Sequence, residues 1–196
     1  LSWTYKQNLK LMIVNSDNDA AGSCIHGLGF AYLNGALEQG GFFDSATKKG
    51  VWAAGDFKHG WNPVRIPCDN LADGTAQGAT TEALARLVAV IVLGDVLDDH
   101  SHVEMNKLLK QAAHGPDPSF LLRKEVDNHL KDDQVTHAEI GIGHDPHVYS
   151  EVALVKGVGL KADKTYIVAW QNIDWKSYWT WDIITIMKNS IAMYES

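Results

Sequence analysis

Cys24 and His137 are the two residues of this chain whose types and positions suggest a shared reaction. Cys24 follows Gly22-Ser23 and begins an apolar run with helical spacing, whereas His137 begins a segment with the character of a strand. The first-turn N–H groups of a helix stabilise a thiolate, and a nearby imidazolium lowers the thiol pKa further. The two residues therefore predict a thiol nucleophile that a histidine activates as general base.

Such a pair also needs a polar group that orients the imidazole and donors that hold the oxyanion. Asn172 follows a predicted strand over residues 165–170, and Asp174 lies two residues further on, so either side chain is a candidate to orient His137. Backbone N–H groups around Cys24, together with Asn18, are the predicted oxyanion donors. This chemistry needs no cofactor.

These segments resemble the papain-like cysteine peptidase superfamily. Gly22-Ser23-Cys24 is similar to the Gly-Ser-Cys run that begins the family's central helix, and residues 137–143 are similar to its His-Ala-x-x-x-x-Gly strand. Residues 166–175 loosely match the strand and tryptophan around its orienting asparagine. The chain departs from the family where Ile25 replaces an aromatic residue, and where no glutamine lies nearer upstream than Gln7.

The chain fits better the looser pattern of bacterial effector proteases and cell-wall amidases, which use a Cys–His pair with a variable third residue. The resemblance implies a protease or amidase of the toxin or effector kind. Its substrate would be a peptide or a protein, cleaved at peptide-type amide bonds.

Two histidine-rich segments offer a competing chemistry. His100 and His102 follow two aspartates, and His144 and His147 flank an Asp-Pro pair. Imidazole and carboxylate groups at such spacings bind zinc-like ions, which activate water. Neither segment matches a motif with fixed ligand spacing. A metal-dependent hydrolase that uses these four histidines is therefore the alternative function.

The two cysteines leave a third interpretation open. Cys24 and Cys68 are compatible with a disulfide in a secreted protein or with two free thiols in a reducing compartment. In the first case the chain would be a secreted, non-enzymatic binding domain. Its surface would include the tryptophans that crowd the C-terminal region, Trp170, Trp175, Trp179 and Trp181. Because the chain begins at Leu1 rather than Met, we expect a mature or trimmed product. We expect a secreted or exported protein rather than a cytoplasmic one, although the missing signal peptide says little about export.

Length and charge restrict the class of protein. A chain of 196 residues with 45% hydrophobic and 21% charged residues is typical of one globular domain. The formal net charge of −7 repels phosphate backbones, so we expect no nucleic-acid partner. The longest apolar run, residues 84–97, contains Arg86 and Asp95 and is too short to cross a bilayer, so we expect no membrane insertion.

Hydrophobic spacing and capping residues predict the elements that must position these groups. We expect a capping loop over residues 15–19, helices over 24–37, 80–94, 101–113 and 119–130, and strands over 136–143, 148–155 and 165–170. Shorter strands are predicted over 51–54 and 63–66, whereas 9–14 and 183–194 fit either class. N-terminal helices followed by a mostly antiparallel sheet predict an α+β fold with a papain-like layout. The whole chain, residues 1–196, would be one catalytic domain, helical over about 15–130 and sheet over about 131–196.

Overall fold

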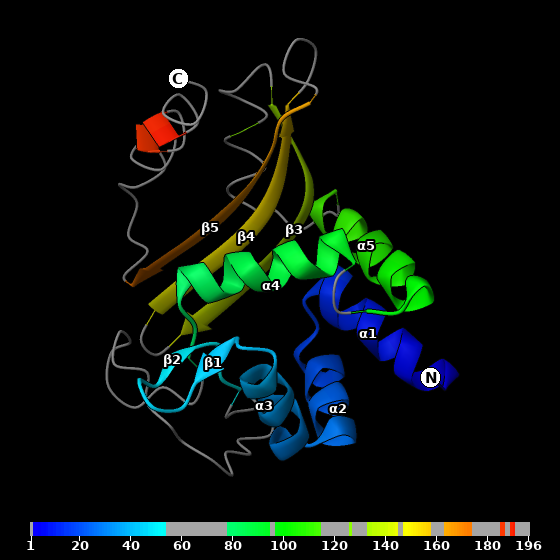
Figure 1. Ribbon diagram of the computed structural model, residues 1–196. Coiled ribbons are helices and arrows are strands. Elements are labelled where there is room, and N and C mark those ends of the chain that lie inside the picture. Colours follow the sequence, from blue (N-terminus) through cyan, green and yellow to red (C-terminus); the bar gives the residue numbers. More distant parts are fainter. Residues whose placement is uncertain are drawn as a thin grey trace.

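The computed structural model describes residues 2–53, 78–94, 97–114, 126, 133–144, 147–157, 163–173, 185–186 and 189–190. Its helices are α1 (Trp3–Asn15), α2 (Asn18–Leu28), α3 (Phe30–Gln39), α4 (Thr81–Leu93) and α5 (Asp99–Ala113). Its strands are β1 (Phe43–Asp44), β2 (Lys49–Gly50), β3 (Asp133–His144), β4 (His147–Gly157) and β5 (Thr165–Ile173). Helices precede the main sheet along the chain, and α4 and α5 lie beside it (Figure 1), so the predicted α+β class is confirmed.

Polar caps explain where most of the helices begin. The side chains of Ser2, Asp17, Thr80 and Asp98 each accept a hydrogen bond from a first-turn N–H group, at the starts of α1, α2, α4 and α5. The helices predicted over 80–94 and 101–113 are confirmed as α4 and α5. The ambiguous run over 9–14 belongs to α1.

The helix predicted over residues 24–37 is wrong at both its start and its continuity. α2 begins at Asn18, six residues before Cys24, because the Asp17 carboxylate caps the helix there. Gly29 then interrupts the helix, with a φ of 82° that side-chain-bearing residues rarely adopt. The segment therefore forms two helices, α2 and α3.

The main sheet is an antiparallel meander in the order β3-β4-β5. His137 lies opposite Leu154 of β4, which in turn lies opposite Ile167 of β5. A register shift between Val135 and His137 leaves Thr136 as an extra residue on β3. The three strands predicted from the sequence are confirmed, each with longer bounds than predicted.

The core lies between the helices and the main sheet. Ala112 and Ala113 of α5 are fully buried against valines and alanines of β3 and β4. Ile13 of α1 and Trp170 of β5 pack against the edge of this cluster. The core therefore holds the C-terminal half of α5 against the strand that carries His137.

A smaller unit joins α3 to a short hairpin. β1 and β2 pair antiparallel, and Trp52 forms a single bridge to Gly78. Asn34 of α3 is buried, and its carboxamide exchanges two hydrogen bonds with the backbone of Ala53. The strand predicted over 51–54 is thus reduced to the bridge at Trp52 within the described residues.

Several predictions fall outside the described residues. These are the strand over 63–66, the helix over 119–130 apart from Val126, and most of residues 183–194. Among the described helices, none combines the length and the apolar character that a bilayer crossing requires.

Candidate functional site

The junction of α1 and α2 fixes a polar triplet, Ser16-Asp17-Asn18. Ser16 ends α1 in the left-handed conformation, with a φ of 53°. The Asp17 N–H group donates to the Leu11 carbonyl at 3.2 Å, and its carboxylate accepts from the Ala20 N–H group at 2.9 Å. One short segment therefore ends one helix and begins the next, which holds its backbone in place.

The outer members of this triplet present polar groups to solvent. Ser16 and Asn18 are both exposed, on either side of the capping aspartate. Within the described part of the chain, neither side chain makes a hydrogen bond. A hydroxyl and a carboxamide are thus held by a rigid backbone while their own hydrogen-bonding capacity stays available to a ligand.

Cys24 lies in the interior of α2 rather than at its start. It is the seventh residue of the helix, so the free N–H groups of the first turn are more than one turn away. The thiol is buried and free, with only 4% of the residue exposed. Burial raises the pKa of the Cys24 thiol, which is the opposite of what a thiolate nucleophile needs.

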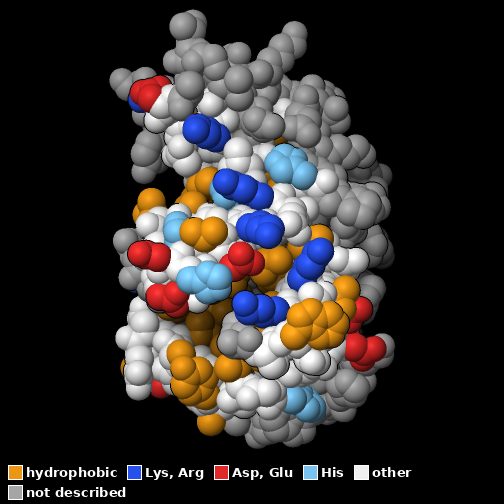
Figure 2. Space-filling view, turned by 90° about the vertical axis from the view of Figure 1, so that its right-hand side faces the viewer, with side chains coloured by type: hydrophobic (Ala, Val, Ile, Leu, Met, Phe, Trp, Pro, Cys, Tyr) orange, Lys and Arg blue, Asp and Glu red, His pale blue; other side chains and the backbone are white. Residues whose placement is uncertain are grey.

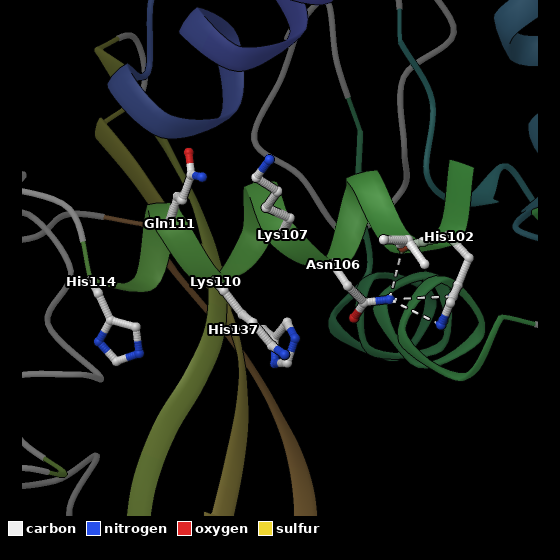
Figure 3. Close-up of a pocket in the computed structure, with 8 residues that line it drawn as sticks. His102, Asn106, Lys107, Lys110, Gln111, His114 and His137 are labelled. Atoms are coloured by element: carbon white, nitrogen blue, oxygen red, sulfur yellow. Dashed lines mark hydrogen bonds between the residues drawn. The ribbon is translucent and has the colours of Figure 1, made fainter. Parts of the chain in front are cut away.

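His137 is buried on β3 beneath the C-terminal half of α5. Only 6% of the residue is exposed, and its Nδ1 atom lies 2.9 Å from the Thr136 hydroxyl oxygen. Burial, followed by the positive charges of Lys110 and His114 on α5, lowers the pKa of His137 to about 4. Figure 3 shows the Lys110 side chain reaching from α5 toward the imidazole.

The predicted catalytic residues occupy separate parts of the fold. α2 packs against α1 and α3, whereas β3 packs against β4 and α5. No hydrogen bond or charge interaction joins Cys24 to His137 among the described residues, and the ionisable neighbour of Cys24 is Tyr5 of α1.

The predicted orienting residues lie far from His137. Asn172 lies on β5, opposite Tyr149 of β4. It is five residues, roughly 17 Å along the strand, from Ile167, which is in register with His137 through β4. Asp174 lies outside the described residues.

The four histidines of the metal alternative are also divided between elements. His100 and His102 lie in the first turns of α5, whereas the backbones of His144 and His147 pair in register where β3 and β4 meet. The Nδ1 atom of His102 lies 3.0 Å from the Ile91 carbonyl oxygen of α4, and this contact uses one of its two nitrogens. Within the residues that the structure describes, no group of three or more His, Cys, Asp or Glu residues is placed to hold a metal ion.

Comparison with known proteins identifies a different family from the one that the sequence motifs indicated. A family described as "Beta-lactamase enzyme family" matches residues 1–170. No curated protein matches the chain. Several solved β-lactamase structures share its fold.

A halotolerant bacterial β-lactamase has a TM-score of 0.58 and 15% identity to the chain, over 89% of this chain and 59% of its own. A β-lactamase from Burkholderia vietnamiensis has a TM-score of 0.60 and 17% identity, over 91% of this chain and 58% of its own. A β-lactamase from Burkholderia ambifaria has a TM-score of 0.58 and 14% identity, over 98% of this chain and 66% of its own. The chain thus spans 58–66% of the length of these three neighbours.

These findings overturn the predicted family and function. The resemblance to papain-like cysteine peptidases, with the papain-like layout, is wrong, because the family match covers most of the chain and the shared fold is that of β-lactamases. The thiol protease, amidase and effector functions are wrong for the same reason, and so is the metal-dependent hydrolase. The binding domain with a Cys24–Cys68 disulfide is not supported, because Cys24 is a free thiol and Cys68 lies outside the described residues.

The comparison also explains a signal that the sequence analysis missed. Serine β-lactamases and penicillin-binding proteins share three active-site motifs, Ser-x-x-Lys, Ser-Asp-Asn and Lys-Thr-Gly. Ser16-Asp17-Asn18 matches the second of them in sequence, and we interpreted it only as a capping loop. The match is compatible with the capping role, since Asp17 is the N-cap of α2 while Ser16 and Asn18 stay exposed.

Of the other two motifs, Ser-x-x-Lys is matched only on a turn, and Lys-Thr-Gly is not matched in this sequence. Ser45-Ala46-Thr47-Lys48 matches the first in letters, but it lies on the exposed turn between β1 and β2 rather than on a helix. The sequence contains no Lys-Thr-Gly triplet.

Proposed function

The chain belongs to the β-lactamase enzyme family, and from this premise we propose that it acts in serine-dependent hydrolysis of β-lactams. The observation that carries the proposal is the Ser16-Asp17-Asn18 triplet, which has a fixed backbone and exposed outer side chains. We propose that this triplet forms one wall of the acyl-transfer site.

Each member of the triplet can be given a chemical task. Opening an amide ring by acyl transfer requires a proton for the departing nitrogen, and a hydroxyl both accepts and donates protons. Ser16 would pass that proton, because its hydroxyl is exposed and makes no hydrogen bond within the described residues. Asn18 would bind the polar groups of the substrate through its carboxamide, and its predicted part in holding the oxyanion belongs to the same proposal.

Asp17 would act through structure rather than through contact with the substrate. Its carboxylate is committed to the Ala20 N–H group and its own N–H group to the Leu11 carbonyl. These two bonds fix the backbone on both sides of the triplet. Asp17 is therefore a positioning residue for Ser16 and Asn18.

Ser45 is not assigned the nucleophilic role. Residues three apart share a face on a helix, which places a lysine next to a serine in the Ser-x-x-Lys motif. On this turn the Asp44 carboxylate instead accepts from the Ala46 and Thr47 N–H groups and from the Thr47 hydroxyl. Lys48 takes the left-handed conformation, with a φ of 56°.

A chromogenic cephalosporin tests the proposal directly. We expect Ser16→Ala to lower kcat/KM by about 10²-fold or more, because loss of a positioned proton donor typically costs that much. Ser23→Ala is the matched control, since the Ser23 hydroxyl donates to the Asp19 carbonyl of its own helix at 2.8 Å. Equal activity of the Ser16 variant and the wild type would contradict the proposal.

The Ser-Asp-Asn triplet also supports one second candidate, a β-lactam receptor that is acylated without turnover, because penicillin-binding proteins share this motif. A fluorescent penicillin separates the two functions by gel and intact mass. A stable adduct without hydrolysis would indicate the receptor, whereas hydrolysis would indicate the enzyme. Peptide mapping of the adduct would identify the acylated serine. A wild-type protein that neither hydrolyses nor retains a β-lactam would overturn both.

A further inference from the structure

A groove of about 780 Å³ runs along α5 and reaches His137 on β3. Its lining combines apolar surface, to which Val103 contributes, with charged and polar side chains of α5, chiefly Lys107, Lys110 and His114, in addition to His137. No acidic side chain lines it among the described residues. Figure 2 shows the corresponding face, where Lys and His side chains gather and Asp or Glu side chains lie among and beside them, on a protein whose net charge is −7. The described lining of the groove is therefore positive, although acidic side chains are present elsewhere on this face.

The groove cations have no counterion in the described part of the protein. Lys107 and Lys110 are exposed, and neither forms an ion pair or a hydrogen bond there. Lys110 and His114 lie close enough to His137 for their charges to oppose its protonation. Like charges held this close favour an anion between them, because it relieves their mutual repulsion.

His137 adds a buried atom that lacks a partner. Its Nε2 atom is shielded from solvent and makes no hydrogen bond, whereas Nδ1 contacts the Thr136 hydroxyl. Thr136 in turn donates to the Leu154 carbonyl at 3.3 Å, so its oxygen can accept the Nδ1 proton. In that tautomer a neutral ring carries a lone pair on Nε2, and uptake of one proton turns Nε2 into a donor.

We propose that this groove binds a compact tetrahedral dianion of the sulfate and phosphate class, held by Lys110 and His114 and joined by the protonated Nε2 atom of His137. The Lys110 side chain extends toward the imidazole (Figure 3), and it shifts to contact the anion as the anion enters. The proton comes from solvent, and no covalent bond changes. The site is separate from the Ser16-Asp17-Asn18 triplet and does not depend on the proposed function.

Binding is coupled to proton uptake. The charged groups that face His137 are Lys110 and His114 of α5, while β4 places the apolar Leu154 opposite it. A bound dianion offsets both positive charges and accepts a hydrogen bond from the protonated ring, so it favours that ring. By linkage, the anion binds more tightly as the pH falls.

Sodium sulfate is the probe, because sulfate keeps its charge between pH 5 and pH 8. We expect it to shift the His137 imidazole NMR signals saturably at pH 6, against sodium chloride at the same ionic strength. The dissociation constant should rise by at least threefold at pH 8. A shift no larger than that in sodium chloride, or equal affinity at both pH values, would overturn the proposal.

Two exposed lysines provide the test and its control. Lys110 of α5 lines the groove and points toward His137 (Figure 3), whereas Lys49 lies on β2 and is not part of the lining. Both are exposed, so either is replaceable without disturbing the core. We expect Lys110→Gln to weaken sulfate binding by at least about fivefold and Lys49→Gln to change it by less than twofold. Equal weakening by the two variants would indicate diffuse attraction instead of a site and would overturn the proposal.

Discussion

Acidification should destabilise this protein through His137, a buried imidazole that stays neutral in the folded state. Burial, with Lys110 and His114 nearby, lowers its pKa from 6.5 to about 4. The unfolded chain therefore binds more protons than the folded chain between these two values. Stability that is complete above pH 6.5 is lost as the pH falls toward 4.

The magnitude follows from the difference between the two pKa values. At about 1.4 kcal/mol for each pH unit, the full loss amounts to about 3 kcal/mol, of which about 2 kcal/mol is reached at pH 5. The residue is 6% exposed, so solvent screens this effect little. A loss of this size is a large fraction of the stability of an ordinary domain.

Urea unfolding followed by circular dichroism measures this effect when His137→Gln is compared with the wild type. Between pH 7.5 and pH 5 the wild type should lose about 2 kcal/mol more than the variant, since other titrating groups contribute equally to both. His100→Gln is the control, because His100 is exposed on the same protein, and it should follow the wild type within about 0.5 kcal/mol. Equal losses in the wild type and the His137 variant would refute the reasoning, as would an imidazole NMR titration with a midpoint near pH 6.5.

Substitutions at Gly50, Gly35 and Asp17, together with chemical labelling of Cys24, test the described fold. Gly50→Ala should destabilise the protein by more than about 3 kcal/mol, because a Cβ atom there would lie 2.1 Å from the Phe42 carbonyl oxygen at a φ of 119°. Gly35→Ala, with open space around it on α3, should instead stabilise by about 0.5–1 kcal/mol in the same thermal unfolding assay. Asp17→Ala should cost about 1 kcal/mol through loss of the cap while Asp17→Asn retains most of it, and equal unfolding midpoints for these two variants would contradict the assigned cap. Native Cys24 should react with iodoacetamide much more slowly than Cys24 in the urea-unfolded chain at pH 8, whereas fast labelling of the folded protein would argue against its burial.

Local signals in the sequence were sufficient for α4, α5 and the three strands of the main sheet, but not for β1, β2 or the separation of α2 from α3. Thr80 begins α4, and the alternation in the last third of the chain gave all three long strands. Capping and side-chain periodicity involve residues a few positions apart, so they can be recognised without knowledge of the tertiary structure.

The functional error arose from one helix boundary. Cys24 was predicted to be a nucleophile because it was interpreted as the first residue of a helix. The Asp17 cap shows that α2 begins at Asn18, so Cys24 lies in the interior of the helix and is buried. The pairing with His137 was an assumption about tertiary structure that no local pattern supports. The Ser16-Asp17-Asn18 triplet was overlooked because its capping role already accounted for all three residue types.

The meander of the main sheet has a consequence for how the chain folds. β3 pairs with β4, and β4 pairs with β5, so these contacts between neighbouring strands close short loops at little cost in chain entropy. The contact of α1 with α5 is different, because α1 ends at Asn15 and α5 begins at Asp99. We expect the β-meander to form early and the docking of the N-terminal helices to be slow. The hydrogen bonds of the Ser16-Asp17-Asn18 junction are local, but the junction would be held against the rest of the protein only after α1 docks on α5. A partly folded chain would then have its sheet before its proposed active-site wall was in place.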